Sequence, residues 1–180
     1  LWMTRNLALG CNGSGSTYGD TIISKDLTPA DTNIQSNWNT PTVSLKTGNS
    51  YTAARMECDS EFGAYYNYTT VSAGTITGSA NTTVATSDIC PLGWRLPTHT
   101  EEAGIANSTY QTAFNPVYGG RYYDGKISYT THGFWWTSDN NSASSGGAHR
   151  YAMYFLNNTL TSASYSHQRD FGDYIRCVSK

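Results

Sequence analysis

The sequence has little charge of either sign. Only 13% of its 180 residues are Asp, Glu, Lys or Arg, and the formal net charge is −2. The eleven basic residues are scattered, so the chain lacks the basic patch that binds nucleic acid. It also lacks a run of about 20 apolar residues that could span a membrane, and any stretch that resembles a signal peptide. We therefore expect an export signal or anchor to lie outside this sequence.

Closely spaced cysteines are absent as well. The chain has four cysteines and no C-x-x-C motif; they are Cys11, Cys58, Cys90 and Cys177. Structural zinc sites need closely spaced ligand pairs, so this spacing does not favour a metal site. Two long-range disulfides fit it better and indicate an oxidising, extracellular or cell-surface location. The alternative is a set of free, buried thiols.

Aromatic residues are plentiful, and they stand among many Ser, Thr and Asn residues. Phe, Trp and Tyr make up 13% of the chain, with 14 tyrosines, which is enough apolar surface for a folded core. The length predicts a single domain over residues 1–180. The residues expected to anchor its core are Trp2, Trp94, Trp135 and Trp136.

Two helices are predicted in the first two thirds of the chain. Residues 50–62 carry Ala, Met and Glu and form the first candidate. The second begins at Thr98, because Thr98 and Glu101 have the T-x-x-E spacing of a capping box. After Asn107 the helix signals fade. Residues 10–47 and 70–88 are interpreted as irregular loops.

The C-terminal third is typical of antiparallel strands. Residues 120–129 predict a hairpin with Asp124 and Gly125 at its turn. Residues 132–136 form a predicted strand, and residues 151–156 pair with a strand that follows Asn157 and Asn158. Shorter strands are predicted at the two ends of the chain, in residues 1–9 and 173–178. Helices followed by an antiparallel sheet give the α+β fold class.

No catalytic constellation stands out. None of the four histidines accompanies a G-x-S-x-G or similar nucleophile motif. The acidic pair Glu101 and Glu102 fits a helix start, where negative charge is favourable. We therefore expect no catalytic residue and no enzyme activity, although a pair of carboxylates that hydrolyses cell-wall glycans is kept as an alternative.

No cofactor is expected, and one segment has the chemistry of an ion site. Asp139, Asn140 and Asn141 have oxygen-bearing side chains that could bind calcium. The alternative is a polar turn, which Asp and Asn favour on their own. We expect no metal in the functional site.

The C-terminal strands carry a residue palette that is typical of binding surfaces. Tyrosine gives a large contact area at a small entropic cost, while Ser and Asn give adaptable hydrogen bonds. The alternative is that these tyrosines only pack against the sheet. The candidate ligand contacts are Asn140, Asn141, His149, Tyr151, Tyr154, Asn157, Tyr165, His167, Arg169, Asp170, Asp173 and Tyr174.

Several stretches together resemble a known family. They are "WMTRNL" near the start, "CDSEFGAYYNY", "CPLGWRLPT", "GGRYYDGKI", "GFWWTSD" and "IRCV" near the end. In this order and spacing they resemble the Fibrobacter succinogenes major paralogous domain family. The resemblance extends to the wider group of C-type-lectin-like folds, which includes formylglycine-generating enzymes and the variable proteins of diversity-generating retroelements.

The resemblance implies a C-type-lectin-like fold with paired terminal strands, two helices and long irregular loops. It also implies disulfides Cys11–Cys58 and Cys90–Cys177. The Glu-Pro-Asn, Gln-Pro-Asp and Trp-Asn-Asp motifs of calcium-dependent sugar binding are missing, and Cys177 occupies a structural position instead of a catalytic one.

The sequence therefore predicts a secreted or cell-surface adhesion and recognition domain. Its ligand would be a protein or glycan on another cell surface, and its contact surface would be the C-terminal strands and loops. The composition of residues 139–174 fits the variable segment of a diversity-generating retroelement. A structural module that assembles with copies of itself is the main alternative, and a cell-wall glycan hydrolase is a further one.

Overall fold

The computed structural model combines short helices with small antiparallel sheets, and strand predominates. This confirms the mixed composition that the sequence predicts. The structure describes residues 1–8, 56–59, 62–73, 85, 87–91, 93–106, 108–123, 126–140, 149–157, 159–169 and 171–180. Its elements are β1 (Met56–Asp59), β2 (Gly63–Tyr66), α2 (Tyr68–Val71), β3 (Trp94–Arg95), α3 (His99–Ala103), the 3₁₀ turn η1 (Gly104–Ala106), α4 (Ser108–Phe114), β4 (Arg121–Tyr123), β5 (Lys126–Ser128), β6 (His132–Asn140), β7 (His149–Leu156), β8 (Thr159–Gln168) and β9 (Val178–Ser179).

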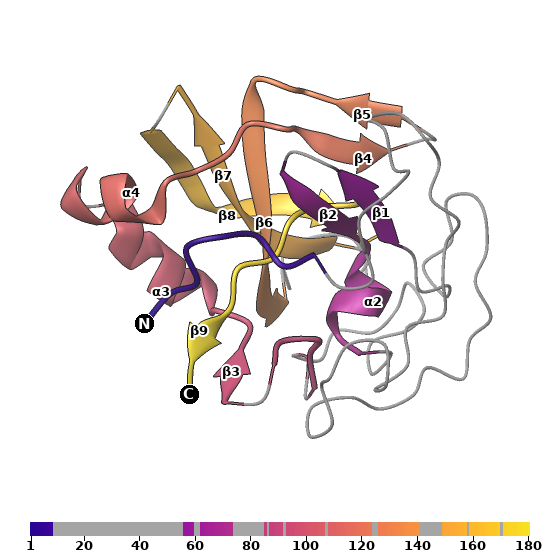
Figure 1. Ribbon diagram of the computed structural model, residues 1–180, viewed down its shortest axis with the longest axis horizontal. Helices are drawn as coiled ribbons and strands as arrows, with labels where there is room; N and C mark the ends of the chain where they lie inside the picture. The colour runs from indigo at the N-terminus through magenta and orange to yellow at the C-terminus, as the bar shows by residue number, and fades with distance from the viewer. Residues whose placement is uncertain are drawn as a thin grey trace.

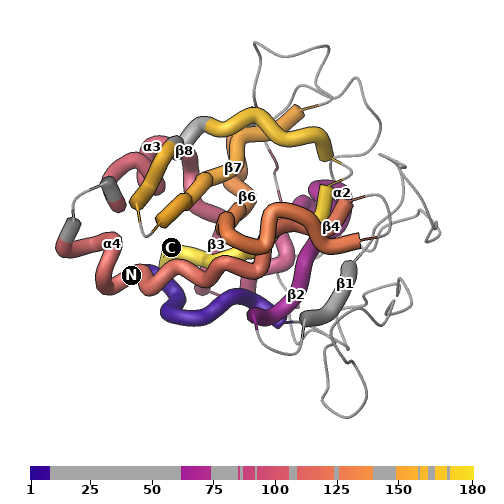
Figure 2. The backbone as a smooth tube through the Cα atoms, turned by 90° about the horizontal axis from the view of Figure 1, so that it is seen from above, coloured from indigo at the N-terminus to yellow at the C-terminus, as the bar shows by residue number. Residues whose placement is uncertain are grey.

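A three-stranded antiparallel sheet in the order β6-β7-β8 forms the centre of the molecule (Figure 1). Phe134 pairs with Tyr154, and Ala152 pairs with both Trp136 and Tyr165. The helices α3 and α4 lie on one flank of this sheet, whereas β1, β2 and α2 lie on the other (Figures 1 and 2). The strand predicted at residues 132–136 and the hairpin that follows it are both confirmed.

The strand β6 is buried on both of its faces. Successive side chains of a strand point to opposite sides, and the adjacent Trp135 and Trp136 are both fully buried. Trp135 contacts Phe114 of α4 edge-on at 5.2 Å between ring centroids, while Trp136 contacts Tyr68 of α2 at 5.3 Å. The indole N–H of Trp136 also donates to the backbone oxygen of Tyr66 at 2.6 Å. The two tryptophans therefore fix both flanks of the molecule to one strand.

Two local predictions are confirmed, the second of them for its paired strands. The helix α3 begins with the capping box: the Thr98 hydroxyl accepts from the Glu101 backbone N–H, and the Glu101 carboxylate accepts from the Thr98 backbone N–H. The hairpin at residues 120–129 is present as β4 paired with β5, with Tyr122 opposite Ile127. Its turn residues, Asp124 and Gly125, lie outside the described part of the chain.

The two ends of the chain are hydrogen-bonded to each other. The backbone N–H of Met3 donates to Cys177, that of Leu7 to Ile175, and that of Ser179 to Leu1. Both termini accordingly lie on the same side of the molecule (Figures 1 and 2). The predicted regular strands at the ends are shorter than expected: Trp2 makes one bridging pair with Val178, and β9 contains two residues. Other links between the two ends are single backbone hydrogen bonds outside the regular strands.

A disulfide joins Cys90 to Cys177, as the resemblance implies. The two cysteines are 87 residues apart and both are fully buried. A cross-link that closes a loop of this length stabilises the folded chain by about 4 kcal/mol in the chain-entropy model. The second expected disulfide falls outside the described residues, because these do not include Cys11 or the side chain of Cys58.

Two helix predictions are wrong. Within residues 50–62, Met56–Asp59 form the strand β1, which pairs with β2. Propensity favoured a helix there, but the β1–β2 pair holds Tyr65 and Tyr66 in the core. Conversely, helix α4 was not predicted because its sequence, STYQTAF, has no acidic or basic end signal. It forms because Phe114 packs against Trp2, Trp135 and Phe155.

Candidate functional site

The predicted ligand contacts on β7 and β8 fall on two different faces of the sheet. Tyr154 and Tyr165 share one face, where their ring centroids are 5.1 Å apart. Tyr151 lies on the opposite face, where its ring is 4.8 Å from that of His99 of α3. His149 is on this second face as well, and its Nδ1 is 2.9 Å from the Ser166 hydroxyl. Two of the predicted contacts, His149 and Tyr151, therefore lie on the helix flank.

Four predicted contacts are buried side chains. His167 and Asp173 are completely inaccessible, as is Tyr174, and Arg169 is exposed by only 1%. Tyr174 donates its hydroxyl to the Tyr65 hydroxyl at 2.8 Å inside the core. In this arrangement a surface ligand has no access to these side chains, so they support the surface instead of forming it.

Of the remaining predicted contacts, Asn157 is the one whose side chain the structure describes. Asn157 is exposed at the β7–β8 turn with φ +51°, a left-handed conformation that Asn tolerates well. The side chain of Asn140 and the residues Asn141 and Asp170 lie outside the described part of the chain. The predicted calcium site therefore stays a prediction, because two of its three side chains are not described. The third, Asp139, accepts a hydrogen bond from the His99 backbone N–H at 2.5 Å.

An aromatic cluster on the first face of the sheet is the strongest candidate site. We call it the aromatic face and define it as Tyr129, His132, Phe134, Tyr154 and Tyr165. Phe134 lies at its centre and is only 3% exposed, whereas Tyr129 and Tyr165 are 55% and 40% exposed. His132 and Tyr154 are partly exposed between them. Large exposed aromatic side chains that gather in one place are unusual unless they bind something.

The rings of the aromatic face are ordered by mutual contact. The centroid of Phe134 lies 5.9 Å from that of His132 and 5.2 Å from that of Tyr154, and the ring planes are within 10° of parallel. Tyr165 and Tyr129 follow at 6.1 and 6.5 Å. Partial burial, together with the neighbouring Tyr165, raises the pKa of Tyr154, so its phenol is neutral at physiological pH.

Arg121 of β4 borders the aromatic face. Its guanidinium carbon lies 4.6 Å from the Tyr129 ring centroid and 4.3 Å from that of Phe171, within the range of cation–π contacts. It is also 5.5 Å from the ring centroid of Phe134. Planar guanidinium groups stack well on aromatic rings, so these contacts fix the orientation of the charge.

A buried histidine connects Arg121 to a buried aspartate. The Nη1 of Arg121 is 3.0 Å from Nε2 of His167, and Nδ1 of His167 is 2.5 Å from Oδ2 of Asp173. Arginine can only donate, so Nε2 must accept, and the proton of a neutral imidazole then sits on Nδ1. His167 is therefore a neutral relay between a cation and a carboxylate. With Nε2 occupied by Arg121, this pair is not arranged as a general base.

Tyr129 has a strained backbone. Its φ is +59°, in the left-handed region that bulky residues rarely adopt. Such a conformation costs of the order of 1 to 3 kcal/mol, and it is found most often at binding and catalytic sites. The strain presents the Tyr129 ring at the edge of the aromatic face, above Arg121.

Three residues of this site were missed by sequence reasoning: Arg121, Tyr129 and His132. The first two flank the correctly predicted β4–β5 hairpin, and His132 begins the predicted strand. Their order in the sequence gives no signal that the hairpin folds toward β7 and β8. The one available signal was that the predicted hairpin carries Arg121 together with several tyrosines, a composition that is typical of binding surfaces.

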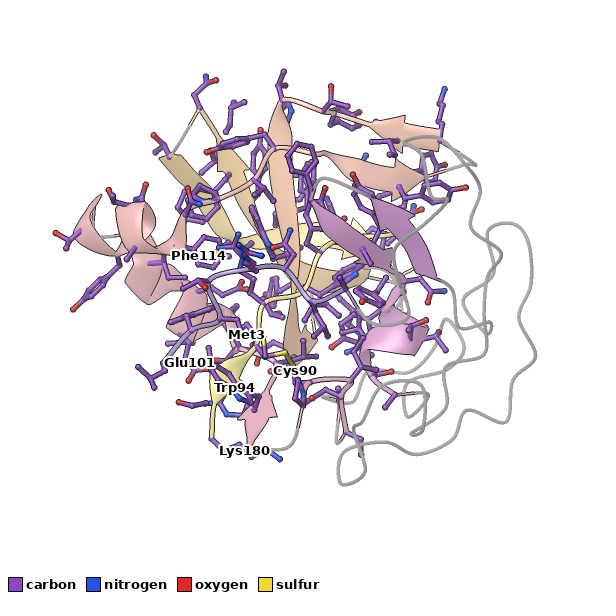
Figure 3. All side chains as sticks on the ribbon, viewed as in Figure 1. Met3, Cys90, Trp94, Glu101, Phe114 and Lys180 are labelled. Atoms are coloured by element: carbon purple, nitrogen blue, oxygen red, sulfur yellow. A yellow bond between two sulfur atoms is a disulfide. The ribbon has the colours of Figure 1, made fainter. Side chains whose placement is uncertain are left out.

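A separate apolar cavity lies between the N-terminal segment and the helices α3 and α4. It has a volume of about 510 Å³. Its lining includes Trp2, Met3, Ile105, Tyr110 and Phe114, with Glu101 at its border. Figure 3 labels Met3, Glu101 and Phe114 on this side of the molecule, with Cys90 and Trp94 nearby. Its lining differs from the aromatic face because the described lining residues include no Arg, Lys or His side chain.

The described ranges contain neither a metal-binding cluster nor a membrane-spanning helix. These residues contain no group of three His, Cys, Asp or Glu side chains that could hold a metal ion. Among the described helices, none has the length and apolar character needed to cross a bilayer.

Compared with protein-family models, with curated proteins and with solved structures, the chain gave no match.

Proposed function

We propose that this chain is an extracellular or cell-surface binding domain whose aromatic face contacts a protein or glycan ligand. The observation that carries the proposal is the cluster of partly exposed rings around Phe134, bordered by Arg121. Tyr and Arg are the residues most enriched at binding hot spots. The buried Trp135 and Trp136 beneath them provide a rigid base.

The C-type-lectin-like fold and the resemblance to the Fibrobacter succinogenes major paralogous domain family belong to the same proposal. Support comes from the hydrogen-bonded chain ends, from the helices α3 and α4, and from the Cys90–Cys177 disulfide. The disulfide also favours, weakly, an oxidising location.

Binding to arrays of cell-surface glycans and proteins, followed by substitution, tests the proposal. Tyr154→Ala and Tyr165→Ala should each weaken binding of a captured ligand about tenfold or more, because hot-spot tyrosines contribute about 1.4 kcal/mol or more. Tyr110→Ala is the matched control, since Tyr110 is 61% exposed but lies on α4. If Tyr110→Ala weakens binding and the other two do not, the aromatic face is the wrong surface.

Diversification by a retroelement is part of the proposal for residues 139–174. In this range the accessible Tyr154 and Tyr165 alternate with fully buried residues such as Ala152, Phe155 and His167. A variable segment should change the first kind and keep the second. Sequencing of the flanking DNA for a reverse transcriptase and a near-copy of this segment is the decisive measurement.

Self-assembly is the second candidate, because exposed rings can also pack against a copy of the same chain. Light scattering over a range of protein concentrations separates the two functions. A mass that rises with concentration and falls back in Tyr165→Ala would favour assembly, whereas a constant monomer mass favours recognition of another molecule.

A further inference from the structure

We infer that the ligand of the aromatic face is an acidic sugar, with Arg121 contacting its carboxylate and the tyrosine rings stacking on its pyranose ring. This inference rests on the proposed function and makes it specific. Its basis is the charge, the size and the geometry of the site.

The charge of the site is the first argument. Arg121 makes one hydrogen bond, from Nη1 to His167, and three ring contacts. Within the described residues it has no carboxylate at ion-pair distance, and the nearest compensating acid, Asp173, is reached only through the neutral His167. Its Nε is buried without a hydrogen-bond partner, whereas its Nη2 makes no hydrogen bond to a described residue and is not such a buried, unsatisfied atom. This Nη2 can donate a charge-assisted hydrogen bond to a carboxylate, which is roughly twice as strong as a hydrogen bond between neutral groups.

Preorganisation is the second argument. The guanidinium is held between the Tyr129 and Phe171 rings, at 4.6 and 4.3 Å, and is tied to a buried imidazole. A free arginine side chain loses conformational entropy when it binds a ligand. Here the folded protein has already ordered it. A fixed cation beside exposed rings suits a ligand that carries one anionic group at a defined place.

The size of the site favours a sugar over a protein. The Arg121 guanidinium and the rings of Tyr129, His132, Tyr154 and Tyr165 all lie within 6.5 Å of the Phe134 ring. Stable protein–protein interfaces bury about 1,200 to 2,000 Å² and use 20 to 30 residues on each side. A cluster of this size instead matches one or two pyranose rings.

The geometry of the rings fits the same ligand. His132, Phe134 and Tyr154 are within 11° of parallel, so they present one common orientation. The C–H face of a pyranose is apolar and can pack on partly exposed rings such as those of Tyr154 and Tyr165, while the Tyr165 phenol can bond sugar hydroxyls. The class of ligand is therefore a uronic or sialic acid residue at the exposed end of a glycan.

Isothermal titration calorimetry with simple sugars tests this inference. The probes are the methyl glycosides of glucuronic and galacturonic acid, N-acetylneuraminic acid, and the neutral methyl glycosides of glucose and galactose. We expect the acidic sugars to bind with a Kd of the order of 1 mM and the neutral sugars at least tenfold more weakly, because a charge-assisted hydrogen bond contributes 1.4 kcal/mol or more. Raising the salt concentration should weaken only the acidic sugars.

Substitutions assign the effect to the site. Arg121→Gln should abolish the preference for acidic sugars, Arg121→Lys should keep part of it, and Tyr129→Ala should weaken both sugar classes. Arg5→Gln is the matched control, because Arg5 is an exposed arginine of the N-terminal segment. If Arg121→Gln fails to fold, Arg121→Lys and Tyr129→Ala decide in its place, since both leave a donor or the His167 contact intact.

The failures of the two proposals are distinguishable. Equal binding of neutral and acidic sugars, or a preference that survives both Arg121 substitutions, overturns the acidic-sugar inference and leaves the binding function standing. Acetate that binds as tightly as the uronic acids also overturns it, because the rings would then play no part. The acidic-sugar inference is also overturned if the protein binds no acidic sugar but binds a protein ligand, and Tyr154→Ala abolishes that binding. A ligand unaffected by every substitution on the aromatic face overturns the proposed function itself.

Discussion

Glu101 and Glu102 are neighbours in α3, and their carboxyl groups meet opposite environments. The Glu101 carboxylate accepts hydrogen bonds from both terminal nitrogens of Arg95, at 2.7 and 2.6 Å, which lowers its pKa to about 2. Glu102 is fully buried, and neither of its carboxyl oxygens has a hydrogen-bond partner in the described structure. Burial, followed by the charges of Asp139 and Glu101, raises its pKa well above the usual range.

Glu102→Gln should change how stability depends on pH. A buried carboxyl group with a raised pKa binds a proton in the folded state that the unfolded chain releases above its ordinary pKa of about 4.3. The free energy of unfolding of the wild type should therefore decline as the pH rises from about 5 toward the folded-state pKa. Glu102→Gln removes this decline, so the variant should gain on the wild type as pH increases. Urea denaturation at pH 5 and at pH 8 measures the difference.

Glu101→Gln is the matched control and has the opposite sign. A lowered pKa contributes stability above the ordinary value, which is lost as the pH falls toward about 2. The variant should be less stable than the wild type at pH 7 by about 1 kcal/mol, the magnitude of a lost helix cap and a surface ion pair. The two should converge in acid. If the free energy of unfolding depends on pH in the same way in both variants, the raised pKa of the buried Glu102 carboxyl group is contradicted.

The residue scale also shows what a short motif can predict. The role of Glu101 follows from the T-x-x-E spacing alone, because a capping box involves only one turn of chain. Nothing in the spacing distinguishes the next residue. Glu102 is buried because the sheet lies against that side of α3, which is a property of the tertiary packing.

At the scale of elements, the β4–β5 hairpin is positioned by the glycines that precede it. Gly120 has φ +77°, and a Cβ built on it would lie 2.2 Å from the backbone oxygen of Ser128. At Gly119 a Cβ would lie 2.0 Å from the Tyr174 hydroxyl. Gly120 therefore lets the two strands of the hairpin approach each other, and Gly119 lets the chain pack closely on the core. The hairpin in turn presents Arg121 and Tyr129 to the aromatic face.

Gly120→Ala should destabilise the protein by about 2 to 4 kcal/mol. The left-handed backbone costs an L side chain about 1 to 2 kcal/mol, and the clash with a backbone atom adds an overpacking term of about 1 to 3 kcal/mol. Thermal unfolding measures the loss, and binding at the aromatic face should weaken with it.

Gly104→Ala is the control for this prediction. Gly104 has φ −63°, and nothing lies within 4 Å of a Cβ built there. Alanine should be neutral or stabilise the fold by about 0.4 to 1 kcal/mol, since it restricts the unfolded chain. Equal losses in the two variants would contradict the role given to Gly120.

Elements were predictable where the local pattern and the packing agree. The pairs β4–β5 and β7–β8 follow from turn residues between alternating segments. The helix expected at residues 50–62 failed because pairing with β2 overrides a helix propensity of a few tenths of a kcal/mol per residue. Helix α4 was missed for the converse reason: its stability comes from Phe114 in the core.

At the scale of the whole molecule, one side chain near the N-terminus joins three distant segments. The Asn6 Oδ1 accepts hydrogen bonds from the indole N–H of Trp135 and from Nε of Arg176, each at 2.8 Å. Its Nδ2 donates to the backbone oxygen of Phe62, also at 2.8 Å. Arg176 is only 1% exposed, and this burial lowers its pKa to about 10.

Asn6→Ala should therefore cost about 3 kcal/mol or more. The substitution removes the acceptor shared by two buried donors, the Trp135 indole N–H and the Arg176 Nε, and each buried unsatisfied donor costs about 1 to 3 kcal/mol. Denaturant unfolding followed by tryptophan fluorescence measures the loss. Thr4→Ala, at an exposed position of the same segment, should change stability by less than about 0.5 kcal/mol. A similar small loss for Asn6→Ala would contradict the linking role.

By itself the sequence determined the local features of this protein: the capping box of α3, the hairpins of the C-terminal third, the mixture of helix and antiparallel strand, and tryptophans as anchors. These depend on neighbouring residues, so a linear pattern can encode them. Only the tertiary structure decided which tyrosines are accessible. It buries His167 and Asp173, turns Tyr151 toward α3, and brings Arg121 and Tyr129 to the ring of Phe134. The physical reason is that exposure depends on which segments cover a strand, and these segments come from remote parts of the chain.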